Sequence, residues 1–427
     1  MEILVVGGGA REHALVRALS LDPAVTGLHG APGNPGIGEL ATLHDVDPLD
    51  GAAVAALAKS LGVGLVVVGP EAPLVAGVAD AVRAAGIPAF GPSAAAARLE
   101  GSKAFAKEVM AAAGVPTGDA RVATTLDEVT AALDEFGAPH VVKEDGLAAG
   151  KGVVVTSDRA AALAHAVDCL AKPGGRVVIE EFLDGPEVSL FVLSDGEHVV
   201  PLQPAQDFKR VDDDDAGPNT GGMGAYSPLP WAPAALVDEV VATVAAPTIA
   251  EMARRGTPFA GVLYCGLALT SRGVRVIEFN ARFGDPETQV VLARLATPLA
   301  GILLAAASGA LDRLPPLRWH DEAAVTVVIA AHGYPATVRS GDPVTGIAAA
   351  EALADVHVLH AGTALRDGVL VSSGGRVLSV VATGADLAAA REAAYRGVAR
   401  VTLDGSHHRT DIARRAADAR RAGAAPS

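Results

Sequence analysis

Residues 276–282 of this chain read Val-Ile-Glu-Phe-Asn-Ala-Arg, and this stretch bears most directly on the fold and its chemistry. It is predicted to be a strand that runs into a polar turn. Because side chains alternate between the two faces of a strand, Glu278 and Asn280 should share one face, with Ile277 and Phe279 pointing into the core. A carboxylate and an amide oxygen on one face suit Mg²⁺ or Mn²⁺, hard ions that also bind phosphate and water. The alternative, a solvated polar strand face, is favoured less.

Three cationic side chains are predicted to meet the phosphates of a nucleotide, namely Arg282, Lys143 and Lys151. Arg282, just after the metal-binding strand, is placed to hold a transferring phosphoryl group with two hydrogen bonds. A strand over 141–143 ends in Lys143 and leads into a glycine-rich loop over 146–152, after which a second strand begins. The loop is not a Walker A motif, because its spacing is one residue short, glycine follows Lys151, and no helix follows. We expect a flexible lid over a triphosphate, with an ordinary glycine-rich hairpin as the alternative.

A strand over 177–183 carries Glu180 and Glu181 at its end, and Glu187 follows shortly after. Free backbone at this edge is suited to reading an adenine, and the Glu187 carboxylate is suited to accepting hydrogen bonds from both ribose hydroxyls. Taken alone the pattern is weak, since acidic residues at strand ends are usually solvated.

The N-terminal region alternates buried strands with helices, as in the strand over 3–6 and the helix from Arg11 to Leu21. This rhythm predicts a parallel sheet whose ligands lie at the carboxyl ends of its strands. Gly-Gly-Gly at 7–9 precedes the helix and could present backbone N–H groups to a phosphate. Glu12, however, stands where a dinucleotide-binding fingerprint needs its third glycine, which argues against a nicotinamide-dependent oxidoreductase. Phosphate binding without a dinucleotide is predicted, and a purely structural tight turn is the alternative.

Composition limits the remaining classes. The 427 residues should form two to four domains, and a net charge of −15 disfavours broad nucleic-acid or anionic-membrane surfaces. No apolar stretch reaches the ~20 residues of a membrane helix, and two cysteines exclude a disulfide framework. No signal peptide is expected, because residues 1–4 have no basic region and lead directly into a strand-like segment. A cytoplasmic protein is expected. Pro315-Pro316 is predicted to be a linker before a β-rich unit. Residues 207–224 are expected to be a loop, and the tail after Asp411 is expected to be a solvated helix end.

With these residues assembled, the chain resembles the phosphoribosylamine–glycine ligase family of the ATP-grasp superfamily. The matching segments occur in order along nearly the whole chain, which is more specific than any single motif. They are residues 8–15, 31–34, 68–75, 99–105, 145–152, 180–185, 217–228, 277–289, 333–335 and 374–378.

The resemblance implies an α/β fold with an α+β lid. A parallel-sheet domain that precedes the ATP-grasp core is expected over 1–101. A two-subdomain ATP-grasp core follows over 102–320, with its lid at about 120–187, and a β-rich C-terminal domain over 325–427.

The resemblance also implies a ligase that joins glycine to 5-phosphoribosylamine with ATP and Mg²⁺ or Mn²⁺, the second step of de novo purine synthesis. Glycine's carboxylate would attack the γ-phosphate, and the amine would then attack the resulting glycyl phosphate. A monofunctional monomer is expected, with no nucleic-acid or membrane partner. Two alternatives stay open: an ATP-grasp ligase with another acid or amine, and a nucleotide-binding regulator without catalysis.

Site residues are carried over position by position from the family. Catalysis is assigned to Arg282 and Lys143. ATP binding is assigned to Lys103, Lys143, Gly150, Lys151, Gly152, Glu180, Glu181, Leu183 and Glu187. Substrate binding is assigned to Gly8, Gly9, Glu71, Asp207, Lys209 and Arg282, and metal binding to Glu278 and Asn280.

Two positions depart from the family pattern. Glu144 stands where Ala is frequent and, as the strand neighbour of Lys143, should face away from the phosphates. Phe208 replaces a frequent His, so no proton transfer can rest on that position.

Overall fold

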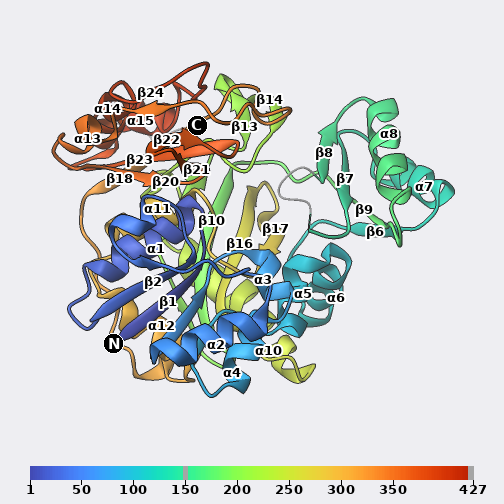
Figure 1. The fold of residues 1–427 in the computed structure, drawn as a ribbon. Helices are drawn as coiled ribbons and strands as arrows, with labels where there is room; N and C mark the ends of the chain where they lie inside the picture. Colours follow the sequence, from blue (N-terminus) through green and yellow to red (C-terminus); the bar gives the residue numbers. More distant parts are fainter. Residues whose placement is uncertain (148–151, 422–427) are drawn as a thin grey trace.

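The computed structural model describes residues 1–147 and 152–421, which fold around four sheets of four or five strands (Figure 1). Gly150 and Lys151, both predicted to bind nucleotide, lie outside the described residues. No helix of the described part is long and apolar enough to cross a membrane.

The first sheet is parallel and is built from residues 2–90. Its strand order is β3-β2-β1-β4-β5, with bounds β1 (Glu2–Gly7), β2 (Gly27–Pro32), β3 (Thr42–Leu43), β4 (Leu65–Val68) and β5 (Ala89–Phe90). Residues 3–6 of β1 are all at most 1% exposed, so both faces of the sheet are covered, as expected for a parallel sheet. The parallel-sheet prediction is confirmed. The helices of this region are α1 (Ala10–Ser20), α2 (Gly51–Leu61), α3 (Glu71–Val75), α4 (Val78–Ala84) and α5 (Ala94–Gly101).

The second sheet is antiparallel and forms the centre of the molecule. Its order is β11-β10-β16-β17, with bounds β10 (Glu187–Asp195), β11 (Val199–Pro201), β16 (Ala260–Thr270) and β17 (Gly273–Asn280). The accompanying helices are α6 (Lys103–Ala113), α9 (Leu236–Val240), α10 (Ala246–Arg254), α11 (Glu287–Arg294) and α12 (Leu299–Ala307).

Strand β17 contains the stretch from which the sequence argument began, and it is not regular. Gly266 pairs with Glu278 but Leu267 pairs with Val276, so Ile277 is an extra, bulged residue. The bulge shifts the alternation: Val276 and Phe279 are buried in the core, whereas Ile277 is half-buried and lines the cavity described below. The prediction that Ile277 points into the core is therefore wrong.

The third sheet belongs to the lid, which stands apart from the rest of the molecule in Figure 1. Its order is β6-β9-β7-β8, with bounds β6 (Ala120–Ala123), β7 (His140–Glu144), β8 (Val153–Thr156) and β9 (Val177–Glu180), and its helices are α7 (Leu126–Phe136) and α8 (Arg159–Leu170). These elements enclose a small hydrophobic core of their own. Strand β9 ends at Glu180, three residues earlier than predicted.

The fourth sheet is antiparallel and joins segments far apart in the chain. Its order is β12-β15-β18-β23-β20, with bounds β12 (Gln206–Asp207), β15 (Gly224–Ser227), β18 (Ala323–Ala330), β20 (Val356–His360) and β23 (Arg376–Gly384). The loop prediction for 207–224 is thus wrong in part, because this segment also holds the hairpin of β13 (Arg210–Asp212) and β14 (Ala216–Asn219). Strand β15 finds its partner in β18, far along the chain, whereas β13 and β14 pair with each other across a short connection. The predicted domain boundary at 320–325 stays a prediction, since this sheet draws on residues from both sides of it.

The remaining elements complete the C-terminal part: β19 (Val344–Thr345), α13 (Ile347–Glu351), β21 (Thr363–Arg366), β22 (Val369–Ser372), α14 (Leu387–Val398), β24 (Thr402–Leu403) and α15 (Arg414–Arg421). The tail is not simply solvated, as predicted, because Ala416 and Ala417 are buried in the main core and α15 packs on α14. Ile412, Ala413, Ala416 and Ala417 all lie in this core, although the sequence around them is rich in arginine.

Two buried histidines connect the first and last parts of the chain. The backbone N–H of His360 in β20 donates to Nδ1 of His13 in α1 at 2.8 Å. Asn34 Nδ2 donates to the carbonyl oxygens of Gly8 and His360, each at 2.9 Å. Burial, with the nearby charges of His360 and Arg17, lowers the pKa of His13 to about 3, and burial lowers that of His360 to about 4.

These depressed pKa values predict acid sensitivity. In the unfolded chain a histidine titrates at about 6.5, so the neutral folded form is favoured above that pH and loses stability as the pH falls below it. Each histidine should lower the free energy of unfolding by about 1.4 kcal/mol per pH unit in that range. Urea unfolding at pH 7 and pH 5 measures this slope. The variant His13→Asn should show a shallower fall than wild type, and an equal fall would contradict the assignment.

Candidate active site

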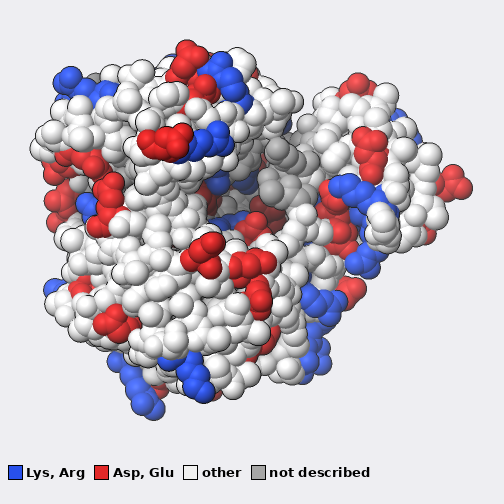
Figure 2. Space-filling view, viewed as in Figure 1, with Lys and Arg blue, Asp and Glu red and all other residues white. Residues whose placement is uncertain are grey.

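A cavity of about 960 Å³ lies where the lid, the central sheet and the N-terminal sheet meet. Figure 2 shows a hollow between the lid and the body of the molecule, with basic and acidic side chains on its walls. Every predicted site residue that the structure describes lines this cavity: Gly8, Gly9, Glu71, Lys103, Lys143, Gly152, Glu180, Glu181, Leu183, Glu187, Asp207, Lys209, Glu278, Asn280 and Arg282. The fold therefore brings the set together, and the role of each residue stays a prediction.

Lys143 is held at the junction of the lid and the central sheet. Its Nζ donates to the Ile277 carbonyl at 2.9 Å, which is the carbonyl of the bulged residue in β17, and lies 3.0 Å from Glu180 Oε1. The other carboxylate oxygen of Glu180 lies 3.0 Å from the Nζ of Lys107. Glu180 is buried, so its negative charge is stabilised by two ammonium groups.

Arg282 is clamped between two carboxylates from the N-terminal region. Its Nε lies 3.2 Å from Glu71 Oε2, and its Nη2 lies 2.9 Å from Glu100 Oε1. Burial lowers the pKa of Arg282, but the charges of Glu100 and Glu71 outweigh burial and raise it overall. Burial by itself raises the pKa of Glu71. The positive charges of Arg282 and Arg11 outweigh burial, so the pKa of Glu71 is below its usual value. The guanidinium is therefore charged and fixed in direction.

The proposed metal-binding carboxylate is surrounded by cations. Burial raises the pKa of Glu278, but Lys209, Lys143, Lys103 and Arg282 together bring it below its ordinary value. Glu278 is thus ionised at neutral pH without a direct ion pair to any described residue.

Asp207, at the end of β12, and Lys209, two residues later, line the same cavity as Glu278. Although part of Asp207 is open to the cavity, loss of bulk water raises its pKa; Lys209 opposes this, Glu287 and Glu187 add to it, and the result is about 7. Lys209 forms an ion pair with Glu187. Glu187, predicted to hold a ribose, is therefore already paired.

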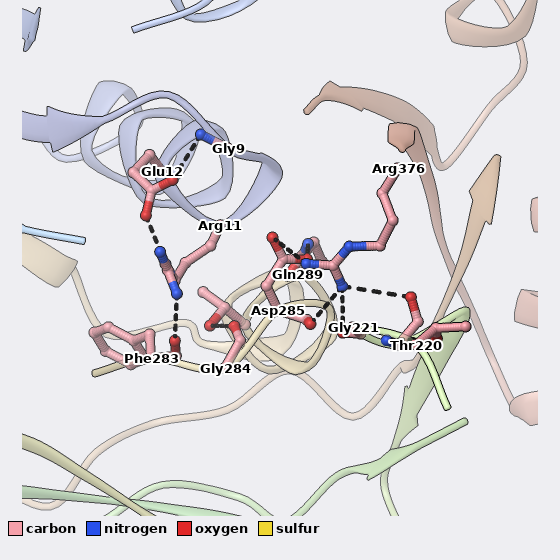
Figure 3. A network of polar contacts seen from close by, with 12 residues as sticks. Gly9, Arg11, Glu12, Thr220, Gly221, Phe283, Gly284, Asp285, Gln289 and Arg376 are labelled. Atoms are coloured by element: carbon pink, nitrogen blue, oxygen red, sulfur yellow. Dashed lines mark hydrogen bonds and ion pairs between the residues drawn. The ribbon is translucent and has the colours of Figure 1, made fainter. Parts of the chain in front are cut away.

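The glycine turn at 7–9 is shaped by Glu12 (Figure 3). The Gly9 N–H donates to Glu12 Oε2 at 2.7 Å, and Arg11 Nε donates to Glu12 Oε1 at 2.5 Å. Gly7 has φ +122, and a Cβ there would lie 2.7 Å from Glu12 Cγ, so only glycine leaves room for this carboxylate. The Gly9 N–H is therefore already bound to a carboxylate of the same chain, and this carboxylate replaces the third glycine of a dinucleotide-binding fingerprint.

The C-terminal sheet also contributes to the cavity. Figure 3 shows Arg376 of β23 reaching Asp285 and the turn at Gly221. Arg376 Nη1 donates to the Asp285 carbonyl at 2.7 Å and to the Gly221 carbonyl, while Nη2 lies 3.4 Å from Asp285 Oδ2. The other carboxylate oxygen of Asp285 accepts from Gln289 Nε2 at 2.8 Å.

Sequence reasoning did not select four residues that shape this site, namely Lys107, Glu100, Asp285 and Arg376. Glu100, Asp285 and Arg376 fall inside the segments that matched the family, so those segments were the available signal. Lys107 lies outside those segments, and its partners Thr117 and Glu180 lie 10 and 73 positions away in sequence, so no local pattern marks it.

The two departures from the family pattern lie outside the cavity. Glu144 pairs with Lys172 Nζ at 2.5 Å and does not line the cavity, so it faces away from the phosphate side as predicted. Phe208 packs beneath the Arg409 guanidinium, whose carbon lies 4.8 Å from the ring centroid, and contacts Tyr226. A neutral ring suits that position, since Arg409 is already bound to Asp411 and Asp215.

The cavity fits a divalent cation that arrives with a nucleotide. Among residues 1–147 and 152–421, no three His, Cys, Asp or Glu side chains are grouped closely enough to hold a metal. Glu278 and Asn280 supply one ionised carboxylate and one amide oxygen on the cavity wall. Mg²⁺ or Mn²⁺ would complete its coordination with phosphate oxygens and water.

A small lid sheet over an antiparallel central sheet, with lysines on one and a carboxylate–amide pair on the other, defines the class of ATP-grasp enzymes. Family models specify it further: the N domain of phosphoribosylglycinamide synthetase matches residues 1–100, its ATP-grasp (A) domain 101–288 and its C domain 324–415. The chain belongs to the phosphoribosylglycinamide synthetase family.

Individual relatives agree with this assignment. The phosphoribosylamine–glycine ligase of Streptomyces coelicolor is 71% identical over 421 residues, which cover 98% of this chain and 100% of that protein. The enzyme of the same name from Leifsonia xyli is 59% identical and covers 97% and 100%. The crystal structure of phosphoribosylamine–glycine ligase from Thermotoga maritima superposes with a TM-score of 0.83 at 31% identity, covering 96% of this chain and 100% of that one.

The Glu12 network leads to a stability prediction. Glu12→Ala removes the acceptor of both the Gly9 N–H and the buried Arg11 side chain, so it should lower the free energy of unfolding by about 2–4 kcal/mol. Glu108→Ala, an equally helical but exposed glutamate in α6, is the matched control and should change it by less than about 0.5 kcal/mol. Urea denaturation followed by circular dichroism measures both, and equal effects of the two substitutions would contradict the network's role.

Proposed function

We propose that this chain joins glycine to 5-phosphoribosylamine at the expense of ATP, forming glycinamide ribonucleotide, ADP and phosphate, the second step of de novo purine synthesis. One observation carries the proposal: a single cavity holds the ATP-grasp cations, the Glu278–Asn280 pair and the glycine turn of the N-terminal sheet, in a chain of this family.

The chemistry needs an activated carboxylate, because a carboxylate oxygen is a poor leaving group. Phosphorylation of glycine by the γ-phosphate of ATP gives glycyl phosphate, whose phosphate then leaves as the amine nitrogen attacks the carbonyl carbon. The protein's contribution to the transfer is placement of the reactants and stabilisation of charge on the moving phosphoryl group.

The cations of the cavity suit that task. Lys143 is anchored on one side by Glu180 and the Ile277 carbonyl, and Arg282 is oriented by Glu71 and Glu100. Lys103 donates to the Gly146 carbonyl at 3.1 Å, at the start of the glycine-rich loop. Glu278 and Asn280 would hold Mg²⁺ or Mn²⁺, which when bound neutralises charge on the phosphates.

The nucleoside would lie against the chain segment that leaves the lid. Because the Glu180 side chain is bound by two lysines, this residue would meet adenine through its backbone, together with Glu181 and Leu183. Glu187 would bind the ribose hydroxyls only after giving up part of its pairing with Lys209.

The amine substrate would approach from the N-terminal sheet, at Gly8, Gly9 and Glu71. Asp207 and Lys209 line the same cavity, and a carboxyl with a pKa of about 7 is suited to accept a proton from an attacking amine near neutral pH. Phe208 beside them has no titratable group. The cytoplasmic location, the monomeric state and the absence of a nucleic-acid partner stay predictions from composition and family resemblance.

Omitting each substrate in turn tests the proposed reaction. ADP release should require glycine and freshly generated phosphoribosylamine together, because the acyl phosphate is consumed only by the amine. Steady-state ADP release without glycine, at the rate of the complete mixture, would show that the acid is wrong. The same result without phosphoribosylamine would show that phosphoribosylamine is not the acceptor, since water or glycine itself would then consume the acyl phosphate.

Replacing the metal-binding carboxylate tests the second part. Glu278→Gln keeps the shape of the side chain but removes its charge, and should lower kcat by about 100-fold or more. Glu197→Gln, an exposed residue of the turn between β10 and β11, should keep the wild-type rate. Glu278→Gln at near-normal rate under limiting Mg²⁺ would contradict the metal assignment.

A further inference from the structure

The lid is joined to the rest of the molecule by two neighbouring chain crossings. The chain enters at residues 116–119, just before β6, and leaves at 180–187, between β9 and β10. The two crossings are bonded to each other, since the Glu181 N–H donates to the Asp119 carbonyl at 2.9 Å. The lid has its own hydrophobic core, so its position relative to the central sheet depends on these crossings and on the contacts of Lys143, Asp145 and Gly146 with the body.

Lys107 of helix α6 binds both crossings at once. On the entering segment its Nζ donates to Thr117 Oγ1 at 2.9 Å and to the Gly118 carbonyl at 3.0 Å. On the leaving segment the same nitrogen lies 3.0 Å from Glu180 Oε2. Three acceptors use the three N–H bonds of an ammonium group, so Lys107 has none left for a ligand although it lines the cavity.

Lys143 differs from Lys107 in this respect. Among the described residues, its acceptors are Glu180 Oε1 and the Ile277 carbonyl. Two acceptors leave one N–H bond of Lys143 to point at a bound phosphate. The two lysines share one buried carboxylate, and only Lys143 keeps a donor for the nucleotide.

Helix α6 is a firm base for this arrangement. It packs on α10 in the central part of the molecule, and Thr117 Oγ1, which accepts from Lys107, itself donates to the Val276 carbonyl of β17 at 2.6 Å. The chain of contacts from α6 through Lys107 and Glu180 to Lys143 therefore ends beside the Ile277 bulge and the Glu278 carboxylate.

We propose that Lys107 is a positioning residue for the nucleotide site: it fixes both crossings of the lid and, through the shared Glu180 carboxylate, sets the direction of the Lys143 ammonium. Without Lys107, the buried Glu180 carboxylate would have Lys143 as its single cation, and Lys143 would turn toward it and away from the cavity. The inference rests on the proposed function only in taking the ligand to be an adenine nucleotide.

The test uses the full chain with Lys107→Met, Lys107→Arg and Lys172→Met. Lys172 is the matched control, an exposed lid lysine that pairs with Glu144 outside the cavity. Calorimetry with MgADP should show Kd raised about ten-fold in Lys107→Met, less in Lys107→Arg, and unchanged in Lys172→Met. The KM for ATP should rise in parallel, with the KM for glycine within about two-fold of wild type, because glycine does not depend on the Lys143 ammonium for binding. Amide exchange at 117–120 and 177–181 should quicken in Lys107→Met alone.

Wild-type MgADP affinity in Lys107→Met would overturn the inference. An equal rise in the KM for ATP and for glycine would also overturn it, since that result describes a general loss of structure.

If Lys107→Met does not fold, Thr117→Val tests the same inference, because it removes one of the three acceptors of Lys107 and should raise the Kd about two- to three-fold. Wild-type binding in both Thr117→Val and Lys107→Arg would then contradict the inference. MgADP binding needs neither glycine nor the amine, so a wrong substrate assignment would leave these outcomes intact. A wild-type chain that does not bind MgADP would refute both proposals.

Discussion

Several buried charges of this cavity are stabilised by oppositely charged partners from another part of the chain. Arg282 shows the constraint: it follows the central strand β17, yet the carboxylates that bind it, Glu71 and Glu100, come from helices α3 and α5. An unpaired guanidinium in this position would carry a large desolvation cost. The pairing therefore joins the N-terminal region to the central sheet and, at the same time, fixes the direction of a guanidinium that lines the cavity between them.

The same logic operates at the lid. Glu180 is buried at the end of β9 and is neutralised by Lys107 from the central part and Lys143 from the lid. The lid has its own core, and the shared carboxylate connects the lysine that the lid carries to helix α6 of the central part. Catalysis by placement and charge stabilisation requires such groups to be fixed before the reactants bind.

The C-terminal sheet is part of the site for a related reason. Arg376 binds Asp285 and the Gly221 turn, so one residue of β23 connects the segment after β17 with the segment before β15. Strands β12 and β15 complete this sheet from within the predicted ATP-grasp segment. The cavity thus depends on all four large sheets, although each contributes only a few side chains.

The parallel N-terminal sheet, the lysine-bearing strand β7 and the polar end of β17 could be predicted from the sequence. Each follows from the order of apolar and polar residues within one short segment. Family resemblance added the set of cavity residues, all of which meet where the structure describes them. Only the tertiary structure decided the bulge at Ile277, the buried face of α15, the strands within 207–224 and the contacts of Lys107. The contacts of Lys107 and the pairing of β15 with β18 depend on partners far away in sequence, whereas the bulge at Ile277 and the hairpin of β13 and β14 depend on the register between adjacent strands. Neither a distant partner nor a strand register can be read from local preference.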